Sequence, residues 1–307
     1  MNILPKCLPL IAFALADLLF TGCHSGPHIP VETPTEGTIH ISVDETFKPV
    51  IDSQLKVFSS SFPNAHILVD YKPEAACIRD LANDSTRMVI VTRGLTLQEE
   101  HWYKDSVRTP AFSGILAFDA VALVVNNHSK DTVMSMEEVK TLLEGNDSKK
   151  RQAVMDGVSA TSTVRYAIDS VLLGRTLGKN VVAARSSPQV IDYVAEHENA
   201  VGFIGVSWIG DQEDSLERTF LKKVKVVAIR CDRCTGMPFV YPYFGYIYLR
   251  QYPMIRGLFY ILKENFSGVG NNFANFLQYE RGQLIFKQAY LVPARMNFDL
   301  RNVEIQQ

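Results

Sequence analysis

The sequence lacks the motifs that mark the common catalytic and nucleic-acid-binding chemistries. It contains no G-x-S-x-G elbow, no H-E-x-x-H zinc motif and no Walker A phosphate loop. Lysine and arginine number 31 against 33 acidic residues, and no dense basic run is present, which argues against a dedicated nucleic-acid surface. The seven histidines are scattered, without a pair at metal-ligand spacing. We therefore expect no enzyme activity, no metal site and no cofactor.

Cysteine is also scarce, with five residues, of which two lie within the first 23 positions. Cys231 and Cys234 form a C-x-x-C pair with no second pair nearby, which disfavours a zinc site. The loop-like sequence Thr-Gly-Met-Pro follows, so the pair is interpreted as a disulfide staple in a loop or as two free thiols. Cys77 lies in a helical pattern and is expected to pack in the interior.

The first 23 residues have the pattern of an export signal. Lys6 precedes an apolar run, Leu8 to Phe20, that is too short to span a bilayer comfortably. Thr-Gly before Cys23 resembles a bacterial lipobox, which predicts cleavage after residue 22 and a lipid on Cys23. An ordinary secretory signal with a chance cysteine is the alternative. Both interpretations place the protein in an oxidising compartment.

Strand and helix patterns alternate after a proline-containing tether that ends at residue 36. The expected strands are 38–43, 65–69 and 87–92, and helical patterns follow them over 50–58, 74–83 and 97–103. This βαβαβα order is typical of a parallel sheet with helices on its faces. Ligands bind such sheets at the carboxyl ends of the strands, which here are Asp44–Phe47, Tyr71–Ala75 and Thr92–Arg93.

The second part of the chain begins with a long apolar strand, 115–126, which is expected to cross between two lobes. A helix over 135–143 is indicated by Ser135 at its start, two glutamates in its first turn and Gly145 after its end. The remaining expected elements are helices over 188–196 and 273–287, strands over 200–205, 224–229 and 244–249, and a closing segment, 290–293.

Small hydroxyl residues crowd the stretch Asp156–Tyr166, where a further helix is expected to begin. The unpaired N–H groups and positive dipole of a helix start favour anions, and short hydroxyl side chains let an anion reach them. Arg165 adds the one full positive charge of the stretch. Two interpretations remain open, an anion site and a plain N-cap.

Eight stretches, in matching order, resemble the substrate-binding protein of a phosphate ABC transporter, in the form common in Bacteroidetes-type lipoproteins. They are Glu45–Phe47, Val91–Leu95, Asp119–Asn126, Ser135–Val139, Asp156–Thr163, Ala200–Gly205, Tyr252–Arg256 and Phe276–Gln283. The resemblance implies a type II periplasmic-binding-protein fold, α/β in class, with two lobes that each carry a mainly parallel sheet flanked by helices. It divides the chain into a lipoprotein signal peptide (1–22), a tether (23–36), lobe I (37–120 plus 245–307) and lobe II (121–244).

The resemblance also implies a set of anion-binding residues. These are Thr46, Phe47, Glu74, Thr92, Arg93, Ser159, Thr161, Ser162, Thr163 and Arg165. Simpler roles compete for several of them: a helix cap for Thr46, a surface ion pair for Arg93, a solvated helix face for Arg165 and a helix-start acid for Glu74. Arg256 is interpreted as structural.

Three positions depart from the family pattern. Glu74 stands in a loop that is usually Gly-Ser-Gly-Gly, Val154 replaces an arginine found in some members, and Glu45 replaces a small residue. A carboxylate that faces a phosphate dianion is unfavourable unless it is protonated, turned away or paired, and Arg93 or Arg79 are the expected partners of Glu74.

The interpretation that follows is a monomeric binding protein, anchored at Cys23 on the periplasmic side of a bacterial membrane. It would capture inorganic phosphate or a similar oxyanion and deliver it to an ABC permease in the inner membrane. The alternative keeps the fold but changes the ligand or the role, to another oxyanion, a small organic acid, or a sensory or orphan binding function.

Overall fold

The computed structural model describes residues 32–107, 111–157, 159–211 and 213–296. The described part belongs to one compact unit that begins at Glu32. The predicted signal peptide, the lipid site at Cys23 and most of the tether lie outside the described residues. Among the described helices, none has the length and apolar character needed to cross a membrane.

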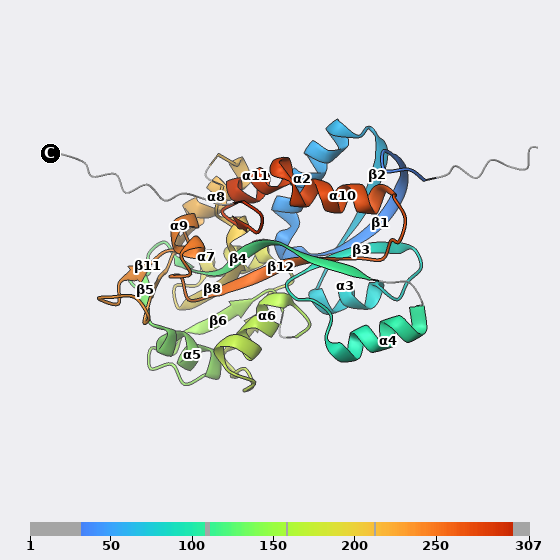
Figure 1. The fold of residues 1–307 in the computed structure, drawn as a ribbon. Coiled ribbons are helices and arrows are strands. Elements are labelled where there is room, and N and C mark those ends of the chain that lie inside the picture. The colour runs from blue at the N-terminus through green and yellow to red at the C-terminus, as the bar shows by residue number, and fades with distance from the viewer. Residues whose placement is uncertain (1–31, 108–110, 158, 212, 297–307) are drawn as a thin grey trace, which may run out of the picture. The chain divides into compact units, whose positions relative to one another are not determined.

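A ten-stranded mixed sheet forms the centre of the fold (Figure 1). Its main path, in spatial order, is β2 (Asn64–Lys72), β1 (Glu36–Asp44), β3 (Thr86–Val91), β12 (Ile255–Leu262), β4 (Phe112–Asn126), β8 (Ala200–Gly205), β6 (Gln152–Met155) and β7 (Val181–Ala183). Two further strands, β9 (Val224–Val226) and β13 (Val292–Pro293), also pair with β4. The outer strands are parallel, as predicted, whereas β12 is antiparallel to both of its neighbours and β4 is antiparallel to β8.

Strand β4 joins the two halves of this sheet. Its residues 112–120 pair with β12, and its residues 121–125 pair with β8. We call β1, β2, β3, β12, β13 and residues 112–120 the first half, and β6, β7, β8, β9 and residues 121–126 the second half. The expected crossing role of the apolar segment 115–126 is therefore confirmed at the level of strand pairing.

Helices cover both faces of the sheet. They are α2 (Lys48–Ser61), α3 (Glu74–Asp80), α4 (Leu97–Val107), α5 (Met136–Glu144), α6 (Ser162–Tyr166), α7 (Ser187–Glu196), α8 (Ser215–Lys223), α9 (Phe244–Tyr248), α10 (Val269–Gln278) and α11 (Glu280–Gln288). In Figure 1, α2, α10 and α11 lie above the first half and α3 and α4 lie below it. A π-helical turn, η2 (Ala167–Val171), extends α6, and the 3-10 turns η1 (Glu45–Phe47) and η3 (Val206–Trp208) follow β1 and β8.

The local signals of α5 act as the sequence predicts. The Ser135 side chain accepts from the Glu138 backbone N–H, and the Glu138 carboxylate accepts from the Ser135 N–H at 2.8 Å, which completes a capping box. Gly145 ends the helix with a left-handed φ of 79° that favours glycine. Its amphipathic face is buried through Val139, Leu142 and Leu143.

Three predictions about secondary structure were wrong. Residues 244–249, expected as an aromatic strand, form helix α9, because Phe244 and Tyr248 stack at i, i+4 spacing with ring centroids 6.3 Å apart. The helix expected over 273–287 is broken at Tyr279, whose backbone is extended (ψ 177°). After the break, Gly282 lies so close to α10 that a Cβ there would clash with the Phe276 carbonyl oxygen. The strand expected over 224–229 is two strands.

That division of 224–229 places its parts in different sheets. β9 pairs with β4, whereas β10 (Ala228–Arg230) pairs with β5 (Val133–Met134) and β11 (Phe239–Val240) in a small three-stranded sheet. The loop between β10 and β11 contains a Cys231–Cys234 disulfide. Of the two alternatives, a disulfide in a loop or two free thiols, the structure shows the disulfide. Cys77 is a free, buried cysteine, as expected.

Candidate functional site

Buried polar residues meet where the two halves of the sheet come together. Thr46 follows β1 in the first half, and its Oγ1 lies 3.4 Å from the Asp156 Oδ2, to which it donates, and 3.4 Å from the Ser162 Oγ. Asp156 follows β6, and Ser162 begins α6, both in the second half. All three side chains are buried. The ends of β1 and β6 therefore bring hydroxyl and carboxyl groups together, as expected for the carboxyl ends of parallel strands.

A buried ion pair stands beside these residues. Arg256, on β12, donates from Nε to the Asp119 Oδ2 at 2.8 Å and from Nη1 to the Ser162 Oγ at 3.0 Å. The two charged side chains are 3% and 0% exposed. The guanidinium also lies over the Phe47 ring, 5.2 Å from its centroid. Arg256 thus connects β4, β12 and the start of α6.

Glycine at position 205 allows the close approach of the two halves. Gly205 ends β8 in the second half, and a Cβ added there would lie 2.6 Å from the Thr46 Cγ2. The next residues form η3, in which Ser207 donates from Oγ to the Thr46 carbonyl oxygen at 3.2 Å. Thr46 is therefore held from both sides, by its neighbours in the first half and by β8 and η3.

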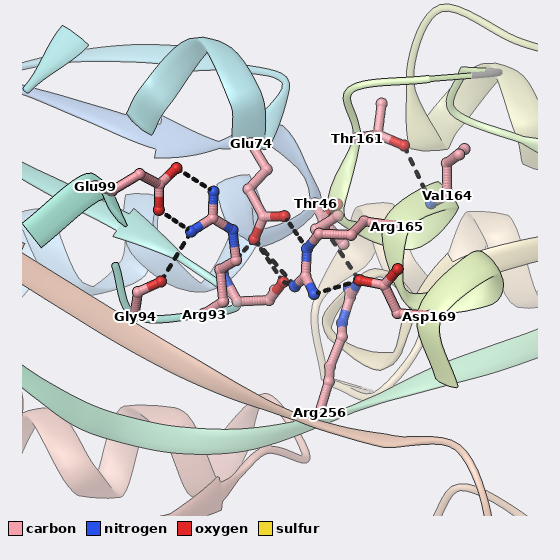
Figure 2. A network of polar contacts seen from close by, with 12 residues as sticks. Thr46, Glu74, Arg93, Gly94, Glu99, Thr161, Val164, Arg165, Asp169 and Arg256 are labelled. Carbon is pink, nitrogen blue, oxygen red and sulfur yellow. Dashed lines mark hydrogen bonds and ion pairs between the residues drawn. The ribbon is translucent and has the colours of Figure 1, made fainter. Parts of the chain in front are cut away.

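Glu74 occupies the centre of a second network across the halves (Figure 2). Its Oε1 accepts from the Thr92 N–H at 2.8 Å and from the Thr92 hydroxyl at 2.6 Å, and its Oε2 accepts from the Arg165 Nε at 2.5 Å. Arg165 also donates to the Thr92 hydroxyl at 2.6 Å. Burial raises the pKa of Glu74, but the Arg165 charge and these hydrogen bonds outweigh it, so the pKa lies below its usual value. The partner of Glu74 is therefore Arg165, not the expected Arg93 or Arg79.

Arg93 turns away from this network and toward α4. It donates from Nη1 and Nη2 to the two carboxylate oxygens of Glu99, at 2.6 and 2.8 Å (Figure 2). The same pair lowers the pKa of Glu99 to about 2. The structure therefore shows Arg93 in an ion pair, which was the alternative to ligand binding for this residue.

The hydroxyl residues of the stretch 156–166 divide into three groups. Ser159 is exposed and lies outside the polar cluster. Thr161 is the N-cap of α6, where its Oγ1 accepts from the Val164 N–H at 3.3 Å. Ser162 and Thr163 are buried, and the Ser162 hydroxyl contacts Thr46 and Arg256 in the cluster. The structure thus shows the N-cap at Thr161, and the anion site remains a prediction.

Glu45 holds the start of a third element. Its carboxylate accepts from the Ser187 Oγ at 3.1 Å and from the Ser187 N–H at 3.4 Å, at the first residue of α7. An acidic group at a helix N-terminus is favourable. Burial and the neighbouring Asp156 nevertheless raise the pKa of Glu45 to about 7. This carboxyl is therefore half ionised near neutral pH.

Other carboxyl groups of the cluster are also destabilised as anions. Burial raises the pKa of Asp44 to about 6, although the Arg256 charge opposes the rise. Burial likewise raises the pKa values of Asp156 and Asp119. Burial therefore shifts the ionisation of these carboxyl groups to higher pH, whereas Arg165 shifts that of Glu74 to lower pH.

Five buried polar atoms in or next to the cluster have no hydrogen-bond partner among the described residues. They are the Asp44 Oδ2, Asp119 Oδ1, Asp156 Oδ1, Thr163 Oγ1 and Arg256 Nη2. The carboxyl oxygens can accept, the guanidinium nitrogen donates, and the hydroxyl can do either. Buried polar groups are normally paired, so this set provides unused hydrogen-bonding capacity for a small polar ligand.

Sequence reasoning missed part of this site. Asp44 lies in a predicted ligand-binding strand end, Asp44–Phe47, but was not among the expected anion-binding residues, and Arg256 was interpreted as structural. The structure brings them within the cluster because β12, from late in the chain, inserts between β3 and β4. A hollow of about 330 Å³ elsewhere, between α2, α8 and α11, is lined by Lys48, Trp208 and Glu217 and does not include these residues. Within the described part of the chain, no cluster of histidine, cysteine and acidic residues has the arrangement of a metal site.

The fold thus has two α/β halves with a polar cluster where they meet. The PBP superfamily domain matches residues 30–281, so the chain belongs to the PBP superfamily of periplasmic-binding-protein-like domains. None of the curated proteins compared with the chain matches its sequence. The α/β fold class inferred from the sequence is thereby confirmed.

Solved structures with the same fold include phosphate receptors. A phosphate ABC transporter substrate-binding protein from Clostridium perfringens, with bound phosphate, has a TM-score of 0.69 at 19% identity and covers 84% of this chain and 100% of its own. An ABC-type phosphate transport receptor from Vibrio cholerae has a TM-score of 0.61 at 18% identity, covering 83% and 99%. A regulatory domain from Synechocystis in complex with 2-PG has a TM-score of 0.54 at 10% identity, covering 79% and 96%.

Proposed function

We propose that this protein captures inorganic phosphate, or a closely similar oxyanion, for an ABC importer. The observation that carries the proposal is the set of unpartnered buried atoms: among them, the Thr163 Oγ1 and Arg256 Nη2 can donate, and the Asp44 Oδ2 and Asp156 Oδ1 can accept. A partly protonated oxyanion offers both complements in a small volume. Charge-assisted hydrogen bonds from a buried guanidinium are strong and directional.

Arg256 supports this assignment in a second way. The arginine that some related proteins carry before the Asp-Gly turn is Val154 here, and Val154 is buried within β6. Arg256 brings a guanidinium to the same cluster from β12 instead. The departure at position 154 therefore does not deprive the site of an arginine.

Ligand entry would use the weakest contacts of the cluster. The two contacts of the Thr46 hydroxyl are both 3.4 Å long, beyond the usual range for O–H···O hydrogen bonds. An oxyanion between Thr46 and Ser162 would exchange these contacts for shorter ones. Separation and closure of the two lobes, 37–120 plus 245–307 and 121–244, would be the accompanying motion.

The membrane context is part of the same proposal. Export by a signal over 1–22, lipid attachment at Cys23 and a tether to residue 36 would hold a monomer at the periplasmic side of a membrane, next to its permease. A Cys23→Ala variant that still partitions with membranes after cell fractionation would refute the anchor.

A different ligand is the second candidate. The Glu74 carboxylate already accepts hydrogen bonds from Thr92 and Arg165. These donors are therefore not available to an anionic ligand. The Synechocystis regulatory domain, which has the same fold, is in complex with 2-PG. Another oxyanion or a small organic acid, in a sensory or orphan role, is therefore the alternative.

Calorimetric titration of the full chain in mild detergent at neutral pH separates these candidates. The proposal expects micromolar or tighter phosphate binding, lost in Thr46→Ala and Thr163→Ala, with arsenate competing and sulfate inert. Thr219→Val is the matched control, because Thr219 lies on α8 and its hydroxyl bonds only the Ser215 carbonyl in the same helix. An absence of heat and of any thermal shift with phosphate would contradict the proposal.

A further inference from the structure

Two carboxylates of the chain occupy positions at which an anionic ligand would find donors. Glu74 accepts from Thr92 and Arg165, with its side chain 3% exposed. Glu45 accepts from the N–H and hydroxyl of Ser187 at the start of α7. A guanidinium and a helix N-terminus are the usual partners of bound phosphate groups. Here both are already used by the protein itself.

The positive charge around the cluster is consequently balanced before any ligand arrives. Arg165 pairs with Glu74, Arg256 pairs with Asp119, and Arg93 pairs with Glu99. Three further carboxyl groups face the cluster. The titratable and charged groups that surround it are Asp44 and Glu45 at the end of β1, Glu74 on α3, Asp119 on β4, Asp156 after β6, Arg165 and Tyr166 on α6, and Arg256 on β12.

The unpartnered atoms point to a ligand that donates as well as accepts. The Asp44 and Asp156 carboxyls, once ionised, each leave a buried acceptor, the Asp44 Oδ2 or the Asp156 Oδ1, that an O–H group of a ligand can meet. The Thr163 Oγ1 and Arg256 Nη2 can donate to ligand oxygens. A fully ionised dianion would meet three carboxyl groups without an unpaired cation to offset them, and in a buried site that repulsion is large.

We propose that the site selects the singly charged, protonated form of its oxyanion, and that Glu74 and Glu45 impose this selection. The inference rests on the proposed function and specifies it: the ligand class is a dihydrogen-phosphate-type monoanion with two O–H donors. Glu74 acts by neutralising Arg165, and Glu45 acts by adding a carboxyl beside Asp156.

The carboxyl groups strengthen the same preference. Glu45 and Asp44 lose their protons around pH 7 and pH 6, where phosphate also passes from monoanion to dianion. Protein and ligand therefore gain negative charge over one interval. Both changes weaken binding as the pH rises, and binding near neutral pH is expected to take up protons.

The test is phosphate titration of the full chain at pH 6 and pH 8, with sulfate as a dianion that carries no proton at either pH. We expect phosphate to bind at least tenfold more weakly at pH 8 and sulfate not to bind at either pH. Calorimetry at pH 7 in two buffers of different ionisation enthalpy is expected to show net proton uptake. Folding at each pH is checked by thermal unfolding.

Two variants assign the selection to its residues. Glu74→Gln releases Arg165 and is expected to raise affinity at pH 8 at least tenfold, while Glu45→Gln is expected to make the pH dependence shallower. Glu144→Gln is the control, because Glu144 ends α5 and pairs with Arg175, and neither is among the groups that surround the cluster. This variant is expected to leave the affinity for phosphate and its pH dependence unchanged.

The failures of the two proposals are distinguishable. Phosphate binding that is equal or tighter at pH 8, or sulfate binding comparable to phosphate, overturns the selection while leaving phosphate capture intact. Phosphate binding at no pH overturns the proposed function and the selection together. If Glu74→Gln does not fold, the pH profile of the unaltered chain and the sulfate titration still decide.

Discussion

The buried pair between Arg256 and Asp119 makes a quantitative prediction about stability. Replacing Arg256 by methionine keeps much of the side-chain volume and removes the charge. It deprives the Asp119 carboxylate of its 2.8 Å partner and the Ser162 hydroxyl of its 3.0 Å donor, and both acceptors are fully buried. Breaking a buried ion pair by removing one partner costs about 3–5 kcal/mol.

This loss is large enough to measure in two ways. For a chain of this size, each kcal/mol shifts the melting temperature by about 2–4 °C, so Arg256→Met is expected to melt about 6–20 °C below the unaltered protein. The deficit also depends on pH. Without Arg256, burial holds the pKa of Asp119 still further above its unfolded value. Stability is therefore lost as the pH rises above the unfolded pKa of this carboxyl, and the deficit is larger at higher pH.

Urea unfolding followed by circular dichroism measures the deficit. The control is the double variant Asp119→Leu with Arg256→Met, because replacing a whole buried pair by apolar residues is often neutral or stabilising. We expect the double variant to recover most of the loss. The reasoning is refuted if the single variant loses less than about 1 kcal/mol, or if the double variant is no more stable than the single one.

Two further predictions concern the junction and its neighbour. Gly205→Ala places a Cβ 2.6 Å from the Thr46 Cγ2 and is expected to lower the free energy of unfolding by about 1–3 kcal/mol. The control is Gly94→Ala, whose Cβ meets no atom within 4 Å, and it is expected to leave the stability unchanged. Equal effects of the two substitutions would contradict the close approach at Gly205. The Arg93–Glu99 pair is partly exposed and is expected to contribute about 1 kcal/mol or less. Because the pKa of Glu99 is lowered to about 2, this contribution is present above pH 4.5 and is lost as the pH falls toward 2. The difference in stability between Glu99→Gln and the unaltered chain should therefore vanish in acid. A difference that stays constant with pH would contradict the prediction.

Local signals were sufficient to predict much of the fold from sequence. The alternation in β1 and the Ser135–Glu138 box of α5 report on the neighbouring residues alone, and both elements form as expected. Helix α9 was missed because aromatic residues favour strands on average, whereas here Phe244 and Tyr248 stack on one helical face. Strand β12 was not predicted, although Ile255–Leu262 is rich in the aliphatic and aromatic residues that favour strands.

The site could be predicted only in part. Thr46 and Ser162 were among the residues that the family resemblance implies, and the structure brings their hydroxyl groups to within 3.4 Å of each other. The choice of Arg165 over Arg93 as the partner of Glu74 depends on how the two halves meet, which no short stretch encodes. Arg256 is brought in by β12, a strand that was not predicted.

The position of β12 also constrains the order in which the chain can fold. This strand fills the gap between β3 and β4, yet it is made after every strand of the second half (Figure 1). Until residues 255–262 have been synthesised, β3 and β4 each present an unpaired edge, and such edges are prone to association with other chains. Pairings between segments so distant in sequence form slowly. A nascent chain therefore cannot complete the first half of its sheet until β12 has been made.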